Sequence, residues 1–231
     1  MKVHKLLLVL LGAIGGLLFF WLFPLKLVFR LAARLGKSTP CPASMAWLVN
    51  NSIRRRYTRP VVDRVGVRPG ERVLELGPGP GMFTVGAARR AGAEGRIITV
   101  DIQPQMIARV EKRVREAGLT NVETCVASAH WLPLKDESVD RAFLVAVLPE
   151  VLDQARALSE LHRVLRSPEP AEGKPGGLLS ITEDFFDPDY PFAFETIRRV
   201  QAAEFSLEQR FGTFWLYTLN FVKKAAASHL E

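Results

Sequence analysis

Cysteine is scarce in this chain of 231 residues, which contains only Cys41 and Cys125. The sequence has no CxxC pair and no His/Cys cluster at metal-ligand spacing, so it favours neither a disulfide framework nor a zinc site. Cys125 lies in an apolar run and is expected to be a small buried residue rather than a redox group. The low cysteine content therefore indicates a reducing compartment, and no metal ion is expected.

Net positive charge is absent from most of the chain, although the net charge of the whole chain is +7. Residues 1–68 contain twelve Lys or Arg and one acidic residue, whereas residues 69–231 contain nineteen Lys or Arg and twenty-three acidic residues. A nucleic-acid groove needs clustered Lys and Arg on its binding face. The acidic body therefore disfavours nucleic acid as a partner, and the basic charge belongs to an N-terminal appendage.

A long hydrophobic run, by contrast, is present near the N-terminus. The twenty residues 6–25, LLLVLLGAIGGLLFFWLFPL, carry no charge, and a helix of that length matches the ~30 Å hydrocarbon core of a bilayer. The run is longer than the apolar part of a signal peptide, and no A-x-A-like cleavage site follows it. It predicts an uncleaved transmembrane anchor over residues 1–26, with a cleaved signal peptide as the alternative.

The charges on either side of the run predict its orientation. Basic residues are more numerous after it than before it, with Lys26, Arg30, Arg34, Lys37, Arg54, Arg55 and Arg56 against Lys2 and Lys5. The chain would then be a single-pass membrane protein with a cytoplasmic body. Residues 27–42 are expected to form a basic helix along the membrane surface, or a solvated linker helix, followed by a linker. Gly12 and Gly16 form a GxxxG pair that could support a homodimer through the membrane helix.

Residues 43–223 have the alternating pattern of one α/β domain. Short β-branched or apolar runs predict strands, and stretches of helical periodicity lie between them. The expected strands cover 72–76, 96–101, 122–127, 139–147 and 178–182, and the expected helices cover 43–57, 82–92, 104–117 and 151–165. This alternation predicts a doubly wound, mostly parallel sheet with helices on both faces.

The C-terminal part departs from this alternation. A predicted helix near 191–204 precedes two strand-like runs, 206–211 and 214–222, which are close enough in the sequence to pair as an antiparallel hairpin. Residues 224–231 form a tail to which no function is assigned.

The stretch VLELGPGPG, residues 73–81, follows a predicted strand and precedes a predicted helix, as a nucleotide-binding loop does. Its three glycines allow backbone N–H groups and a ligand to approach closely; alternatively, they only pack a strand tightly on its helix. Glu75 precedes the loop, where a carboxylate repels a pyrophosphate and favours an ammonium or sulfonium group. Asp101 ends the next strand, where it can accept hydrogen bonds from both ribose hydroxyls or serve as a helix N-cap.

Four stretches together resemble one family. They are LELGPGPG, the TVD that ends in Asp101, LPLKDESVD (132–140), and ELHRVLR followed by PGG. They resemble the class I S-adenosylmethionine-dependent methyltransferases, and in particular the branch with quinone-biosynthesis and phospholipid methyltransferases. The resemblance covers residues 43–223 and implies a Rossmann-like, seven-stranded sheet. The ExGxGxG spacing differs from the GxGxxG of dinucleotide-binding proteins, which disfavours an NAD-dependent reductase.

The resemblance also implies which residues bind the cofactor. Glu75 and the loop residues Gly77, Pro78, Gly79 and Gly81 would hold the amino-acid end of S-adenosylmethionine, Asp101 its ribose, Ile102 one face of its adenine, and Ser128 and Ala129 the polar edge of the adenine. Family members often have Asp at the position of Ser128 and an acid at that of His130, and serine bonds the adenine amine less strongly than a carboxylate does. This difference leaves open a non-catalytic, membrane-tethered module that only binds the cofactor.

The methyl acceptor is expected beyond the carboxyl ends of the strands, next to AVLPE (146–150) and EDFFDPDY (183–190). The second stretch combines carboxylates that could attract and deprotonate an ammonium with aromatic faces that favour a cation; the alternative is a solvated acidic loop. Glu183, Asp184 and His130 are the candidate catalytic bases, with a capping or packing role as the alternative for His130.

Together these features predict a membrane-anchored methyltransferase that acts on a lipid or hydrophobic acceptor at the bilayer. A phospholipid amine head group, a quinone precursor and a hydrophobic thiol are the candidate acceptors. The acidic charge of the body disfavours RNA.

Overall fold

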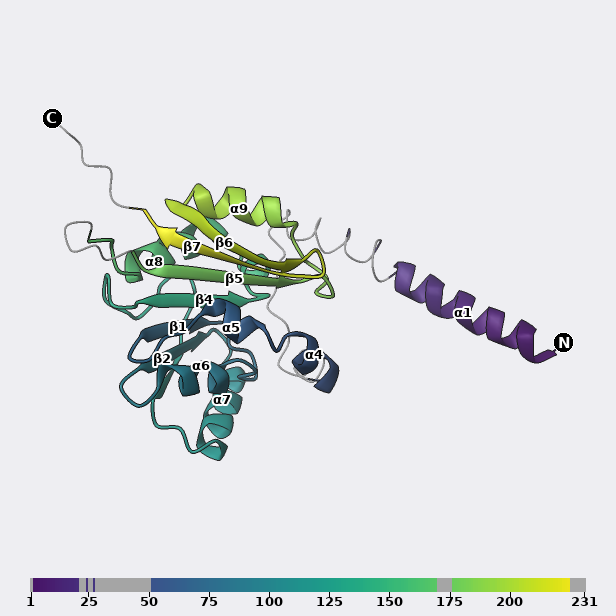
Figure 1. The fold of residues 1–231 in the computed structure, drawn as a ribbon, viewed down its shortest axis with the longest axis horizontal. Helices are drawn as coiled ribbons and strands as arrows, with labels where there is room; N and C mark the ends of the chain where they lie inside the picture. The colour runs from purple at the N-terminus through teal and green to yellow at the C-terminus, as the bar shows by residue number, and fades with distance from the viewer. Residues whose placement is uncertain (1, 21–23, 25–26, 28–50, 170–175, 225–231) are drawn as a thin grey trace.

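The computed structural model describes residues 2–20, 24, 27, 51–169 and 176–224. Helix α1 (Lys2–Phe20) lies apart from the other elements, which form one body (Figure 1). Most of the predicted basic helix and linker (27–42), the first part of the helix expected over 43–57, and all but one residue of the tail (224–231) lie outside the described residues.

The predicted transmembrane span is not supported. Among the residues that the structure describes, no helix is both long and apolar enough to cross a membrane. Of the run of residues 6–25, the structure describes the part in α1 up to Phe20 and residue 24, and the rest lies outside the described residues. The single-pass orientation, which was inferred from that span, is likewise without support. Gly12 and Gly16 lie one turn apart on α1, and dimerisation through them stays a prediction.

Seven strands of the described chain form one sheet in the order β3-β2-β1-β4-β5-β7-β6. The parallel strands are β1 (Arg72–Leu76), β2 (Arg96–Asp101), β3 (Val122–Val126), β4 (Arg141–Val145) and β5 (Leu178–Asp184). β7 (Leu216–Lys223) runs antiparallel to both β5 and β6 (Phe205–Thr213). The mostly parallel sheet with a C-terminal antiparallel hairpin is therefore confirmed.

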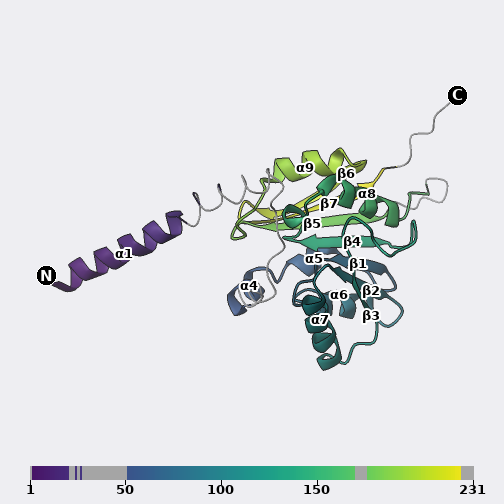
Figure 2. The same ribbon diagram turned by 180° about the vertical axis from the view of Figure 1, so that it is seen from behind.

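Helices cover both faces of this sheet (Figures 1 and 2). On one face lie α5 (Val61–Val65), α6 (Thr84–Ala91) and α7 (Pro104–Glu116), and on the other lie α8 (Gln154–Val164) and α9 (Ala193–Gln201). Val73 packs with α5 and α6, whereas its neighbour Leu74 packs with α8, and both are fully buried. This is the pattern of a strand covered on both faces, because successive side chains of a strand point in opposite directions.

Several element boundaries differ by a few residues from the predicted ones, and for some of them the local reason is visible. β4 ends before residue 147 because Ala146 has a φ of 56°, a left-handed conformation that a strand cannot continue. α8 starts later than residue 151, since Asp153 is its N-cap and accepts a hydrogen bond from the Arg156 N–H. Asn51 caps α4 (Ser52–Tyr57) by accepting a hydrogen bond from the Arg54 N–H. The short helix α5 is an element that the sequence did not predict.

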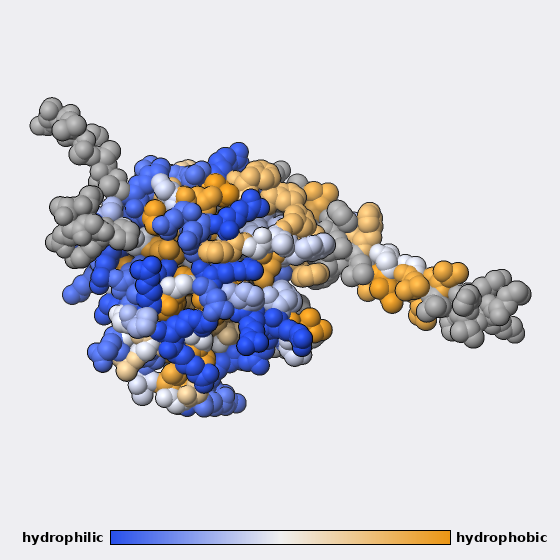
Figure 3. Space-filling model, viewed as in Figure 1, coloured by the Kyte–Doolittle hydropathy of each residue, from blue (hydrophilic) through white to orange (hydrophobic). Residues whose placement is uncertain are grey.

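The position of the glycine loop follows from the strand order. The order of the strands reverses between β1 and β4, and the loops that follow these two strands leave the sheet in opposite directions, which opens a crevice at their carboxyl ends. Hydrophilic residues cover most of the body in Figure 3, whereas α1 exposes apolar side chains such as Leu8 and Leu17.

Candidate active site

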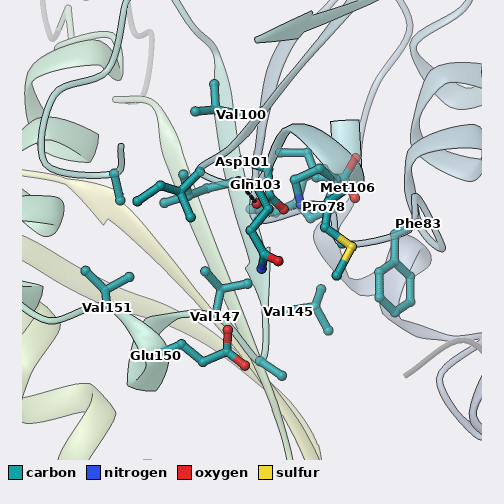
Figure 4. A pocket seen from close by; sticks show the side chains of 18 of the residues that line it. Pro78, Phe83, Val100, Asp101, Gln103, Met106, Val145, Val147, Glu150 and Val151 are labelled. Carbon is teal, nitrogen blue, oxygen red and sulfur yellow. Dashed lines mark hydrogen bonds between the residues drawn. The ribbon is translucent and has the colours of Figure 1, made fainter. Parts of the chain in front are cut away.

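A cavity of about 230 Å³ lies in this crevice. It is lined by residues from the loops that follow β1, β2, β3 and β4, by Arg54 of α4, and by Asp187 of the loop after β5. Figure 4 shows Pro78, Asp101 and Gln103 at one end and Glu150 at the other. We call the first the glycine-loop end. The second, which Glu150 and Asp187 line, is the acidic end.

The glycines of the loop meet two different structural demands. Gly77, Gly79 and Gly81 all have positive φ angles, of 65°, 52° and 76°, where residues with a Cβ are strained. A Cβ on Gly77 would lie 2.5 Å from a methyl group of Val147, whereas one on Gly79 would meet no atom within 4 Å. Gly77 and Gly79 line the cavity, as does Pro78 between them. Gly81 is not among the lining residues and packs against Val110 of α7 instead.

Glu75 places a buried carboxyl group at the glycine-loop end. Its side chain is 2 % exposed and lines the cavity, and one of its oxygens accepts a hydrogen bond of 2.6 Å from the Thr84 hydroxyl. Burial, with a smaller contribution from Asp101, raises the pKa of Glu75 to about 8, although the Thr84 hydrogen bond opposes the shift. A positively charged ligand group next to this carboxyl would stabilise its ionised form, which burial otherwise disfavours.

Asp101 and Ile102 extend the same end of the cavity. The Asp101 carboxylate accepts a hydrogen bond of 2.9 Å from the Gln103 N–H, and burial raises its pKa even though the backbone N–H groups of Gln103, Gly79 and Ile102 lower it. The N-cap of α7 is Gln103 rather than Asp101, so the alternative of a simple capping role does not account for Asp101. Ile102 also lines the cavity and is 56 % exposed, which leaves its side chain free to cover a flat ring.

Ser128, Ala129 and His130 line the cavity from the loop after β3. Ser128 Oγ accepts a hydrogen bond of 3.2 Å from the His130 N–H. The Nε2 atom of His130 accepts one of 3.3 Å from the backbone N–H of Asp153, the N-cap of α8, and the His130 carbonyl accepts one from Arg156. His130 therefore connects this loop to the start of α8, as the alternative packing role requires.

Arg54 and Tyr57 of α4 contact the acidic loop that follows β5. Asp184 is fully buried, and its Oδ2 atom accepts a hydrogen bond of 2.6 Å from the Tyr57 hydroxyl and lies 3.3 Å from Arg54 Nε. Arg54 also donates two hydrogen bonds to Asp187, of 2.9 and 3.2 Å. These contacts hold α4 over the acidic end, and Asp184 itself does not line the cavity.

Glu183 lies behind the acidic end rather than on its wall. It is 1 % exposed, and neither carboxylate oxygen has a hydrogen-bond partner among the described residues. Burial raises its pKa well above the ordinary range, and the charges of Asp189, Asp187, Glu150 and Asp184 raise it further. Burial and the neighbouring carboxylates therefore both favour the neutral form of Glu183. The alternative of a solvated acidic loop does not describe Glu183 and Asp184, which are buried, whereas Asp187 and Asp189 are half-buried. Within the described part of the chain no group of acidic, His or Cys residues is arranged to hold a metal ion.

Sequence reasoning missed Arg54, Tyr57, Glu150 and Asp187 as site residues. Arg54 was counted as a flanking charge of the predicted membrane span, yet it pairs with carboxylates more than a hundred residues away. Glu150 and Asp187 belong to AVLPE (146–150) and EDFFDPDY (183–190), the two stretches expected next to the acceptor. The sequence therefore indicated the correct stretches but not these individual residues. No local pattern distinguishes Arg54 from Arg55 and Arg56, which are exposed.

Comparisons with known proteins agree with this geometry. Residues 74–168 match a family model described as a methyltransferase domain. The chain is 34 % identical over 168 residues to an uncharacterized 37.1 kDa protein in a transposon of Streptomyces fradiae, an alignment that covers 70 % of this chain and 46 % of that protein. It is 35 % identical over 145 residues to a ubiquinone/menaquinone biosynthesis C-methyltransferase of Vibrio vulnificus, covering 61 % of this chain and 53 % of that protein. The chain thus spans about half the length of the curated relatives it matches.

Solved structures share the fold at low sequence identity. A SAM-dependent methyltransferase from Aquifex aeolicus superposes with a TM-score of 0.70 and 20 % identity, covering 80 % of this chain and 100 % of that one. The [4+2]-cyclase SpnF superposes with a TM-score of 0.63 and 18 % identity, covering 92 % and 96 %. Since the second protein is described as a cyclase, the fold by itself does not specify the reaction.

Proposed function

We infer that this chain, an S-adenosylmethionine-dependent methyltransferase, transfers the methyl group of that cofactor to an amine nitrogen of a lipid or other hydrophobic acceptor. The excess of carboxyl groups at and behind the acidic end carries this inference. Glu150, Glu183, Asp184 and Asp187 lie there, and Arg54 pairs with two of them. Such a cluster in a partly desolvated site favours a ligand that is positively charged or that releases a proton.

The residues at the glycine-loop end fit the cofactor. Glu75 is suited to the ammonium of its amino acid, Asp101 to its ribose hydroxyls, and Ile102 with Ser128 to its adenine. The space left open beside Gly79 allows backbone to approach a ligand. The bound cofactor supplies a methyl carbon on a sulfonium, which a nucleophile displaces in line. The chain's own contribution is then to hold the acceptor at attack distance.

The role of proton acceptor passes in this proposal from Glu183 to Glu150 and Asp187. Burial disfavours the ionised form of Glu183, and neither Glu183 nor Asp184, which Arg54 and Tyr57 contact, lines the cavity. Glu150 and Asp187 line the cavity, and burial raises the pKa of Asp187 to about 7, against the lowering effect of Arg54. A group that titrates near neutral pH is well matched to general-base work.

The walls between the two ends favour an apolar acceptor. Val145, Val147, Val151 and Leu152 line the cavity, and Val147 and Val151 are drawn near Glu150 in Figure 4. Apolar side chains contribute through the area they remove from water, so a hydrophobic chain or ring attached to the amine would be bound more tightly than a free amine. The exposed apolar residues of α1 are consistent with an acceptor that resides in a membrane.

Cofactor binding is expected to release protons at neutral pH. With a pKa of about 8 in the empty protein, Glu75 is roughly nine-tenths protonated at pH 7, and an ammonium held against it requires the ionised form. Titration calorimetry at pH 7 in buffers of different ionisation enthalpy should therefore detect about one proton released per cofactor bound. The affinity should fall as the pH decreases from 8, and a Glu75→Gln variant should show neither effect.

A quinone precursor is the second candidate acceptor, because curated relatives at 34–35 % identity are described as quinone-biosynthesis C-methyltransferases. Methylation at a ring carbon also releases a proton, so Glu150 and Asp187 could serve that reaction too. The apolar walls fit either acceptor. The amine is preferred over the quinone precursor only because the carboxyl groups of the acidic end favour a positively charged ligand.

The acceptor is tested by giving the purified full chain labelled S-adenosylmethionine with either phosphatidylethanolamine vesicles or a demethylated quinol in detergent. We expect label in the amine lipid, and a Glu150→Gln variant should lose about 10²-fold in kcat/KM with unchanged cofactor affinity. Glu116→Gln is the matched control, because Glu116 is an exposed carboxylate at the end of α7.

Label in the quinol alone would replace the amine proposal by the second candidate. Tight cofactor binding without transfer to any acceptor would favour the non-catalytic module.

A further inference from the structure

Five exposed aromatic side chains form a continuous surface, which we call the aromatic patch. They are Phe186 (49 % exposed), Phe192 (38 %), Phe194 (65 %), Phe214 (46 %) and Trp215 (53 %). Phe192 stacks on Phe194 with ring centroids 5.8 Å apart, and Phe186 stacks on Trp215 at 6.1 Å. Phe214 joins the two pairs, at 6.1 Å from Phe192 and 5.6 Å from Trp215. Exposed apolar surfaces that are continuous in this way usually mark a binding site.

The aromatic patch is held rigidly from below. Phe185 is buried and contacts the rings of Phe186, Phe214 and Trp215. Tyr190, also buried, donates a hydrogen bond of 2.6 Å to the carbonyl of Phe214. The three segments that carry the patch, namely the loop after β5, the start of α9 and the turn between β6 and β7, are thereby joined to one base. The exposed rings are therefore presented to solvent in a fixed arrangement rather than on a loose loop.

The aromatic patch lies at the same edge of the sheet as the cavity. The turn between β6 and β7 flanks the carboxyl end of β5, because Asp184 pairs with Leu216. Phe186 directly precedes Asp187, which lines the acidic end. In Figure 3 hydrophobic residues gather at the end of the body that faces α1. A partner that covers the patch would thus stand next to the acceptor side of the cavity.

The charge beside the aromatic patch indicates the kind of partner. Tyr57 of α4 contacts Phe186, with ring centroids 6.1 Å apart. The same helix exposes Ile53 (75 %) together with Arg55 and Arg56. Beneath these residues Arg54 pairs with the carboxylates of Asp184 and Asp187 and offsets part of their charge. Exposed aromatic rings beside exposed arginines complement an anionic lipid surface, where Trp and Phe enter the headgroup region and Arg meets the lipid phosphates.

We propose that the aromatic patch and the arginines of α4 dock onto an anionic lipid bilayer and place the acidic end of the cavity at the membrane surface. This docking does not depend on a transmembrane helix, and it does not depend on which atom is methylated. It accounts for a rigid cluster of exposed rings at the mouth of a cavity with apolar walls, since an acceptor embedded in the bilayer would then reach the cavity without crossing water.

Depth-dependent quenching in full-length chains with a single tryptophan tests the proposal. One chain carries Phe in place of Trp21, Trp47 and Trp131 and retains Trp215; its matched control retains only Trp131, which is 73 % exposed on the loop after β3. Each is mixed with phosphatidylcholine and phosphatidylglycerol vesicles that contain brominated acyl chains. We expect at least a roughly twofold loss of Trp215 emission and little change for Trp131. Replacing Arg55 and Arg56 by Gln should weaken vesicle binding about fivefold per arginine.

Two results would overturn the proposal. If the chain co-sediments with vesicles but Trp215 is not quenched, another part of the chain binds the lipid. If Trp215 is protected from the aqueous quencher acrylamide when no vesicles are present, the patch is covered by protein, either other residues of this chain or a second copy. Neither measurement requires methyl transfer, so the docking and the proposed reaction can fail independently.

Discussion

Replacing Glu75 by glutamine is expected to reduce the affinity for S-adenosylmethionine by roughly 10²–10³-fold, or about 3–4 kcal/mol. The glutamine keeps the volume of the side chain and an oxygen that can accept the hydrogen bond from Thr84. It loses the negative charge in a site where Glu75 is 2 % exposed, so the ammonium of the cofactor would be desolvated there without a counter-charge. Titration calorimetry at pH 8, where about half of Glu75 is ionised in the empty protein, measures the difference.

The stability of the empty protein provides the control for this variant. The folded-state pKa of Glu75 is raised to about 8, so burial of the group costs stability as the pH rises above its ordinary value, and this cost grows until the pH passes 8. The glutamine has no such cost, and its Tm without cofactor should equal or exceed that of the parent at pH 8. Asp101→Asn is the matched variant and should lose only about tenfold in affinity, since ribose hydroxyls are neutral. Equal losses in both variants would refute the assignment of the ammonium to Glu75.

Replacing Gly77 by alanine is expected to lower the free energy of unfolding by about 2–4 kcal/mol, more than the same change at Gly79. Both glycines have positive φ angles, which cost an alanine about 1–2 kcal/mol. Only at Gly77 would the new Cβ overlap with Val147, at 2.5 Å from one methyl group and 2.8 Å from the other. Urea unfolding of the Gly77→Ala and Gly79→Ala variants measures the difference, and any effect of alanine on the unfolded chain is common to both.

A double variant separates the two causes at Gly77. Val147→Ala removes the methyl groups that the new Cβ would meet, so Gly77→Ala should cost less in that background and approach the cost of Gly79→Ala. If Gly77→Ala and Gly79→Ala destabilise the parent chain equally, the contact with Val147 is relieved by a small movement, and backbone conformation alone explains the glycine.

The two ends of the cavity differ in how far the sequence predicted them. The glycine-loop end is built from residues that are close in the sequence. Glu75 lies near the end of β1, Gly77 and Gly79 lie in the loop after it, and Asp101 ends β2. The alternation of strands and helices is enough to predict these positions. Their convergence on one cavity follows from parallel strands ending at the same edge. Gly81, in the same motif, packs on α7 instead, because the loop has turned into the body by that residue.

The acidic end required contacts between distant segments. The stretch EDFFDPDY was expected to supply bases from Glu183 and Asp184, yet the fold buries one without a partner and pairs the other with Arg54 and Tyr57. Whether Glu183 and Asp184 are buried or paired depends on which face of the sheet each side chain points to and on which helix covers that face. The same long-range packing brings Phe186, Phe194 and Trp215 to one surface, although no periodic pattern connects them in the sequence.

The sequence by itself determined the order of strands and helices, the glycine loop with a carboxylate on either side of it, and through these the class of cofactor. Each depends on residues within one strand–loop–helix unit, where the spacing of apolar residues and the conformational needs of glycine act locally. Only the tertiary structure decided which carboxyl groups face the cavity, which of them pair with Arg54, and which aromatic rings remain exposed. Those properties depend on burial and on charges brought together from distant segments, and both arise only when the sheet is assembled and α4 packs over the acidic end.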